Sequence, residues 1–90
     1  MNQDRKTSLL TPALCRGARA MLDWTQAELA DRAGVSRSTI RDFEGGRHEL
    51  HRATETQLRH AFEEEGVRMM SDEREISISL RNADAADGSK

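Results

Sequence analysis

The sequence predicts a mainly α-helical domain of four to five helices that ends in a C-terminal β-hairpin or strand. Apolar residues recur at helical spacing between residues 11 and 66, in segments bounded by capping residues and glycines. After Gly66 the apolar period changes from helical to alternating. We therefore expect four parts: a flexible N-terminus at 1–10, the helical domain at 11–66, the hairpin at 67–81 and a disordered tail at 82–90.

The first helix is expected to begin at Thr11-Pro12, because threonine is a good N-cap and proline is tolerated at the first helical position. Leu9 and Leu10, just before it, can fold back on the core. Cys15 lies at the edge of the apolar arc, which favours a packed thiol over a redox sensor. The inner stripe of this helix is expected to consist of Leu14, Ala18, Met21 and Leu22.

Two short helices joined by a tight turn are predicted next. Thr25 and Glu28 have the spacing of a capping box, in which each side chain accepts a hydrogen bond from the other residue's amide. Gly34 supplies a left-handed turn, and Ser36 caps the following helix. The residues expected to bury these two helices are Leu29, Ala30, Ala33, Ile40 and Phe43.

The segments TQAELA (25–30), GVS (34–36), STI (38–40) and FEGGR (43–47) occur in one order and spacing. Together they resemble the Cro and phage-repressor helix-turn-helix proteins, the XRE family, from about residue 11 to residue 67. The resemblance implies a lambda-repressor-like fold. It also implies that the helix at 36–44 lies in the major groove of double-stranded DNA and reads base edges.

The resemblance also implies which residues bind DNA. Arg37 has the best chemistry for reading a base, since its guanidinium can bond guanine O6 and N7 together. Asp42 can either accept from cytosine N4 or hold Arg41 or Arg37 in place. Arg47, and the main-chain amides of its glycine loop, are expected on phosphates, as is Gln26. The full predicted set is Gln26, Ser36, Arg37, Ser38, Thr39, Arg41, Asp42 and Arg47.

Repressors of this type pair an arginine of the first helix with a glutamate that ends the recognition helix. Arg19 and Glu44 match these two positions. The resemblance therefore implies a structural ion pair between the first and third helices.

A formal net charge of −2 does not by itself suggest a protein that binds phosphate groups, but the distribution of the charged residues along the chain does. Residues 36–52 contain four arginines and two histidines against three acids. From residue 53 onward nine acids face five bases. The positive charge is thus concentrated at the predicted reading surface, and the overall acidity should weaken non-specific DNA binding.

The last predicted helix begins with Thr54 and Gln57 as a second capping box, and it buries Leu58, Ala61 and Phe62. Two strands, 67–70 and 75–81, then flank a polar turn. A lone hairpin is marginal in water, so its apolar face must pack on the helices or on another subunit. Short members of the resembled family dimerise through such strands; the sequence leaves open whether the strands pair within or between subunits. The apolar face consists of Ile76, Ile78 and Leu80.

The favoured function is a sequence-specific transcriptional regulator: a homodimeric repressor that binds an inverted repeat in double-stranded DNA. The alternative is a protein-interaction module or antitoxin that uses the same fold to hold a partner protein. No catalytic residues, cofactor or metal are predicted. The histidines of His48-Glu49-Leu50-His51 are one residue too close for the zinc-protease motif. With a single cysteine and no long apolar run, the chain is expected to be cytoplasmic, without a membrane partner.

Overall fold

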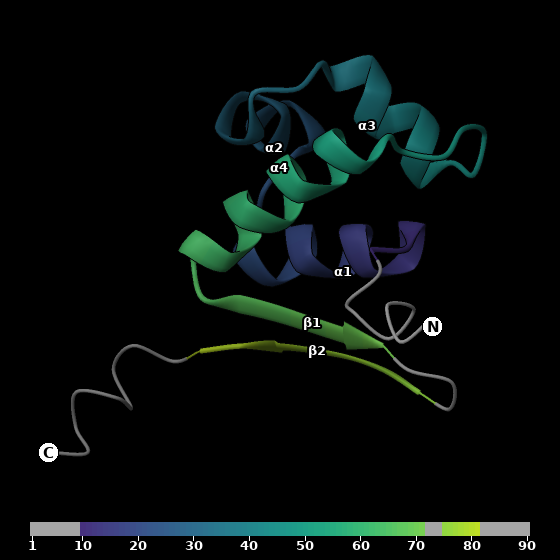
Figure 1. The fold of residues 1–90 in the computed structure, drawn as a ribbon. Helices are drawn as coiled ribbons and strands as arrows, with labels where there is room; N and C mark the ends of the chain where they lie inside the picture. Colours follow the sequence, from purple (N-terminus) through teal and green to yellow (C-terminus); the bar gives the residue numbers. More distant parts are fainter. Residues whose placement is uncertain (1–9, 72–74, 82–90) are drawn as a thin grey trace, which may run out of the picture.

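The computed structural model describes residues 10–71 and 75–81. Figure 1 shows α1 in the middle of the molecule, with α2, α3 and α4 on one side and the hairpin on the other. This is the mainly α fold with a C-terminal hairpin that the sequence predicts. None of the helices in the described ranges is both long and apolar enough to cross a membrane. The elements are α1 (Pro12–Leu22), α2 (Gln26–Ala33), α3 (Arg37–Glu44), α4 (Arg52–Glu64), β1 (Val67–Ser71) and β2 (Ile76–Leu80).

Helix α1 begins where the sequence predicts. Thr11 is its N-cap, and its hydroxyl accepts a hydrogen bond of 3.1 Å from the Leu14 amide. The predicted inner stripe is partly wrong, because Met21 is 39% exposed whereas Cys15 is fully buried. Met21 lies one turn beyond Gly17, the position that lies against Ile78 of β2, so it falls on the side of α1 that only the thin hairpin covers.

The predicted flexible N-terminus extends one residue too far. Leu10 is buried, and its amide donates a 2.8 Å hydrogen bond to the carboxylate of Glu55 on α4. The chain is therefore fixed to the helical core from residue 10 onward. Residues 1–9 lie outside the described ranges, as do 72–74 in the predicted turn and 82–90 in the predicted tail.

Helices α2 and α3 are bounded by the predicted caps. The Thr25 hydroxyl accepts from the Glu28 amide at 3.0 Å, and the Glu28 carboxylate accepts from the Thr25 amide at 2.8 Å. Gly34 ends α2 with a φ of 73°, in the left-handed region that favours glycine. The Ser36 hydroxyl then accepts from the Thr39 amide at 3.1 Å. The turn between the two helices is thus fixed by hydrogen bonds at both helix ends.

The predicted capping box of the last helix is wrong. Helix α4 begins at Arg52, two residues before Thr54, and its N-cap His51 makes no side-chain capping bond. The Gln57 side chain instead donates a 3.1 Å hydrogen bond to the Ala33 carbonyl. The last carbonyls of a helix lack partners within it, so the α2 terminus attracts this amide more strongly than a local cap does. Gln57 consequently ties α4 to the turn before α3.

The two strands pair within the chain and are antiparallel, with Met69 opposite Ile78 and Val67 opposite Leu80. Residues directly opposite each other point to the same face of a sheet, so one face carries all four apolar side chains. Val67 and Met69 are buried in the core, and Ile78 packs against it. Ile76 and Leu80, at the two ends of β2, remain 54% and 41% exposed. The predicted apolar face is therefore used partly by the domain's own core.

The core lies between the helices and β1. Phe62 of α4 is fully buried and stacks on Trp24, with ring centroids 5.9 Å apart. The guanidinium carbon of Arg32 lies over the Trp24 ring, 4.6 Å from its centroid, a cation–π contact. The largest fully buried side chains are Phe62, Leu29, Ile40, Leu58, Val67 and Cys15.

Candidate nucleic-acid interface

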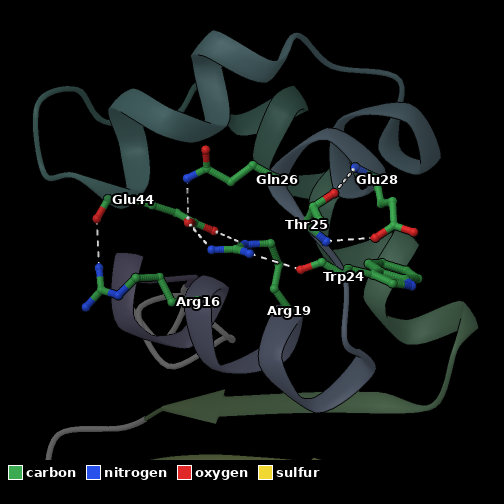
Figure 2. A network of polar contacts seen from close by, with 7 residues as sticks. All are labelled: Arg16, Arg19, Trp24, Thr25, Gln26, Glu28 and Glu44. Carbon is green, nitrogen blue, oxygen red and sulfur yellow. Dashed lines mark hydrogen bonds and ion pairs between the residues drawn. The ribbon is translucent and has the colours of Figure 1, made fainter.

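The last residue of α3, Glu44, is the buried charged residue of the described part of the chain. Figure 2 shows its carboxylate between α1 and α2. Arg19 of α1 donates to both carboxylate oxygens, from Nε at 2.9 Å and from Nη2 at 2.8 Å. The Gln26 amide nitrogen, at the start of α2, donates to Oε1 at 3.0 Å. The pair that the resemblance implied is present, and it gains a third member from α2.

Two further arginine contacts fix α3 relative to α1. Arg16 donates a 2.7 Å hydrogen bond from Nη1 to the backbone carbonyl of Glu44. Arg19 donates from Nη1 to the carbonyl of Trp24 at 3.0 Å, just before α2 (Figure 2). The C-terminus of α3 and the N-terminus of α2 are therefore both anchored on one helix, α1.

The electrostatics of this site favour ionised Glu44. Burial by itself raises the pKa of the Glu44 carboxyl, but hydrogen bonds from Arg19, Gln26 and Cys15 outweigh it and hold that pKa below its usual value. The same bond with Glu44 raises the pKa of Arg19. Burial, and then the neighbouring Glu44, raise the pKa of the Cys15 thiol far above its ordinary range. The site thus holds a charged carboxylate and guanidinium beside a neutral thiol.

The outward face of α3 presents the side chains that sequence analysis selected for DNA. Arg37, Ser38 and Arg41 are exposed. Ser36 and Thr39 are tied together in the cap, with their hydroxyl oxygens 2.8 Å apart. These two residues therefore have a structural role at the start of α3, whatever else they contact.

Asp42 lies beside Arg41, as one of the two alternatives for it requires. The Arg41 Nε and the Asp42 carboxylate oxygen are 3.5 Å apart, a long contact on a side chain that is largely exposed. Exposed ion pairs of this kind hold side chains only weakly. The Arg41 guanidinium is consequently not committed to Asp42.

The glycine loop after α3 differs from what the resemblance implied. The amides of Gly45, Gly46 and Arg47 donate to the carbonyls of Arg41, Phe43 and Asp42 at 3.0, 2.9 and 2.8 Å. These amides satisfy the last carbonyls of α3, which lack helical partners, and so they do not face outward to a phosphate. The expectation of main-chain phosphate contacts at these three positions is therefore wrong. The side chains of Arg47 and His48 are exposed.

The orientation of Gln26 is set by Glu44. A carboxylate can only accept hydrogen bonds, so the Gln26 amide must turn its nitrogen toward Glu44. Figure 2 shows its oxygen on the side away from Glu44. An outward carbonyl oxygen accepts hydrogen bonds, whereas a phosphate offers no donor. A phosphate contact by Gln26 therefore has to use the second N–H of this nitrogen, which Glu44 does not accept, and it stays a prediction.

Sequence reasoning missed Arg16 and Gln57, both of which bind backbone carbonyls of other helices. A side chain that bonds a distant carbonyl leaves no spacing pattern in the sequence. Arg16 lies outside the apolar stripe predicted for the first helix and belongs to none of the motifs identified in the sequence. Both residues are positioning residues for the two central helices.

A model of the helix-turn-helix family matches residues 16–51, from the second turn of α1 to the N-cap of α4. These residues form a helix-turn-helix domain of the Cro and phage-repressor type. A comparison with curated proteins gave no match. In helix-turn-helix domains the second helix of the motif is the recognition helix, and α3 occupies that position. A domain of this type supports the reading of the chain as a DNA-binding helix-turn-helix regulator.

Proposed function

We propose that the protein is a dimeric repressor that binds an inverted repeat in double-stranded DNA, with α3 of each subunit in the major groove. The observation that carries this proposal is the rigid attachment of α3. Arg16 and Arg19 hold its C-terminus on α1, while Arg37 and Arg41 remain exposed on the opposite side. A helix that reads bases needs this combination of fixed position and uncommitted donors.

Arg37 is proposed as the base-reading residue. It is exposed at the first position of α3, and recognition helices of this kind contact base edges through their N-terminal residues. Its guanidinium can donate to guanine O6 and N7 at once. Ser38 and Arg41 are proposed as further members of this DNA-binding face of α3. Ser36, Thr39 and Asp42 are proposed to lie at its border.

Arg47 is proposed as a phosphate contact. Its amide is fixed on the Asp42 carbonyl, and its side chain extends from the loop next to the end of α3. This role needs only a positive charge near the DNA backbone, so it carries no sequence preference. Gln26 is proposed as a second phosphate contact, through the N–H of its amide that Glu44 does not accept.

The dimer is proposed for two reasons. One recognition helix contacts few base pairs, and two related by a two-fold axis read an inverted repeat with half-sites about 34–36 Å apart. Ile76 and Leu80 are also large apolar side chains left exposed at the hairpin. A dimer bound over a promoter represses by excluding the polymerase.

Selection of bound sequences from random double-stranded DNA tests the proposal. We expect enrichment of an inverted repeat with a guanine in each half-site. Enrichment of a single half-site would contradict the dimer but leave base reading by α3 intact. No enrichment at low salt would contradict sequence-specific binding itself.

A second candidate function is a protein-interaction module that uses the hairpin as its contact. Met70 favours it, because this residue is 62% exposed on the sheet face that points away from the helices. In that case the selection experiment yields no enriched DNA, and substitution of Met70 removes binding of the partner protein.

A further inference from the structure

The two ends of α3 are held in different ways. The C-terminal end is fixed on α1 through Glu44. At the other end, the Ser36 hydroxyl lies 3.3 Å from that of Ser38 and 2.8 Å from that of Thr39. Within residues 10–71 and 75–81, no hydrogen bond or ion pair joins residues 36–39 to an element other than α3. The position of this end therefore depends on the turn that leads into it.

Gln57 of α4 holds that turn. Its side-chain Nε2 donates to the carbonyl oxygens of Ala33 at 3.1 Å and of Gly34 at 3.5 Å. Ala33 is the last residue of α2 and Gly34 is its C-cap, so these two carbonyls lack partners within the helix. Helix α4 packs beside α2 (Figure 1), and a Cβ at Gly34 would lie 3.6 Å from Nε2 of Gln57. The amide of Gln57 therefore lies directly against the backbone of the turn.

A small change in this turn has a large effect at the start of α3. The helix has eight residues, so it is about 12 Å long at about 1.5 Å per residue. With its C-terminal end fixed on α1, a tilt of about 5° moves the backbone of Arg37 by about 1 Å. A side chain that makes two hydrogen bonds to one base has to be held within about 0.5 Å of the required position. An anchor at Glu44 alone therefore does not fix the reading position of Arg37.

We propose that Gln57 is a positioning residue for base reading: it fixes the direction in which the chain enters α3, and so the place of Arg37 relative to the DNA. This inference rests on the proposed function, since it takes Arg37 as the residue that reads a base. The N–H groups of the Gln57 amide are directed at the two carbonyls of the turn. Its effect on sequence preference is therefore indirect, through the backbone of residues 33–36.

The position of Gln57 requires a hydrogen-bond donor. Its partners are carbonyl oxygens, and they lie at the C-terminal end of α2, where the helix dipole is negative. A lysine supplies a donor and a positive charge, both of which suit this place. A glutamate supplies acceptors and a negative charge, which do not. A methionine has a similar length but no donor. These three replacements separate the hydrogen bond from the size of the side chain.

The sequence preference of variants at this position tests the inference. Binding to DNA with single base changes first identifies the position whose preference is lost in Arg37→Ala. Gln57→Met and Gln57→Glu should reduce the preference at that position by about 2- to 10-fold, the usual value of one hydrogen bond, whereas Gln57→Lys should retain it. Thr56→Ala is the control, because the Thr56 hydroxyl donates to the Arg52 carbonyl within α4. Circular dichroism checks that each variant is folded at the assay temperature.

Double variants decide whether the effect passes through Arg37. In the Arg37→Ala background, Gln57→Met should cause no further loss of base preference. Arg47 follows the fixed end of α3, so the effects of Gln57→Met and Arg47→Ala on the free energy of DNA binding should add.

The failure of this inference is distinct from that of the proposed function. A folded Gln57→Met variant with the wild-type preference overturns the inference and leaves base reading by α3 intact. An equal loss of affinity for all DNA sequences also overturns it, because that result marks a role in stability alone. A wild type that selects no DNA sequence overturns the proposed function and this inference with it. If Gln57→Met does not fold, Gln57→Asn replaces it, since it keeps the amide on a shorter side chain; the wild-type preference in Gln57→Asn would likewise overturn the inference.

Discussion

Arg19 of α1 and Glu44 of α3 share two hydrogen bonds, of 2.9 and 2.8 Å, and only 3% of the Glu44 side chain is exposed to solvent. A buried ion pair is costly to break on one side, since the remaining charge keeps its desolvation penalty without its partner. The two residues also join α1 to α3, the proposed recognition helix. In the proposed function, stability and DNA recognition therefore depend on the same contact.

Removal of one partner should be more harmful than removal of both. We expect Arg19→Met to lower the free energy of unfolding by about 3–5 kcal/mol, because it leaves the Glu44 carboxylate buried and unpaired. The double variant Arg19→Met/Glu44→Leu should recover a large part of that loss. Urea denaturation measures the free energy of unfolding of the two single variants, Arg19→Met and Glu44→Leu, and of the double variant. Arg59→Ala is the control, since its pair with Glu63 is more exposed and should be worth less than about 1 kcal/mol. Additive effects of the two substitutions would contradict the coupling.

The lowered pKa of Glu44 predicts loss of stability in acid. In the unfolded chain a glutamate carboxyl has a pKa of about 4.3, which is above the pKa of Glu44 in the folded protein. Between these two pKa values the unfolded state therefore binds more protons than the folded state. The contribution of Glu44 is therefore fully present above the unfolded pKa and is lost as the pH falls through the folded pKa. Glu44→Gln should be less stable at pH 7 and should flatten this part of the profile. Equal slopes for the variant and the wild type would assign the acid sensitivity to other carboxyls.

Arg37 at the start of α3 and Arg47 in the loop after it should have different signatures in DNA binding. Arg37→Ala is expected to cost about 1–3 kcal/mol and to relax the preference at one base position. Arg47→Ala should weaken binding to all DNA sequences alike. It should also reduce, by about one, the steepness with which the logarithm of the binding constant falls with the logarithm of the salt concentration. Titration of specific and scrambled DNA at several salt concentrations separates the two. An unchanged base preference in Arg37→Ala would assign reading to another residue.

Gln26 should be intolerant of glutamate. Gln26→Glu keeps the size of the side chain but removes the donor to Glu44 and places a second carboxylate against it. We expect a loss of about 1–3 kcal/mol at pH 7, more than for Gln26→Ala, with partial recovery in acid when one carboxyl is protonated. Thermal unfolding at two pH values measures this. A Gln26→Glu variant as stable as Gln26→Ala would show that the contact with Glu44 is not maintained in solution.

The two isoleucines of β2 should separate dimerisation from folding. Ile76 is 54% exposed, whereas Ile78 packs on the core beside Gly17. Ile76→Asp is therefore expected to give a folded monomer with weak operator binding, and Ile78→Asp to lower the melting temperature as well. Sedimentation and circular dichroism distinguish these outcomes. A folded Ile76→Asp dimer would place the interface elsewhere.

Local signals in the sequence predicted most of the fold. The Thr11 cap, the Thr25–Glu28 capping box, the Gly34 turn and the Ser36 cap depend on residues within a few positions of one another, and the structure contains each of them. The start of α4 was placed wrongly because Gln57 bonds a carbonyl far away in the chain. A local pattern cannot reveal that a distant helix end competes for the same side chain.

The candidate site was predictable only in part for the same reason. The residues on the outward face of α3 follow from helical periodicity, and the resemblance supplied the partner of Arg19. The contact between Gln26 and Glu44, and that between Arg16 and the Glu44 carbonyl, arise from the packing of three helices. Met21 was misplaced because periodicity identifies an apolar arc but not the width of the element that covers it.

Cys15 gives this domain an internal reporter. Its thiol is fully buried between α1 and the Glu44 carboxylate, and its raised pKa keeps it protonated and unreactive at neutral pH. A thiol reagent reaches it only when α1 and α3 separate. The rate of its modification therefore measures how often α1 and α3 separate, and, if α3 binds DNA as proposed, bound DNA should slow the reaction in proportion to its occupancy.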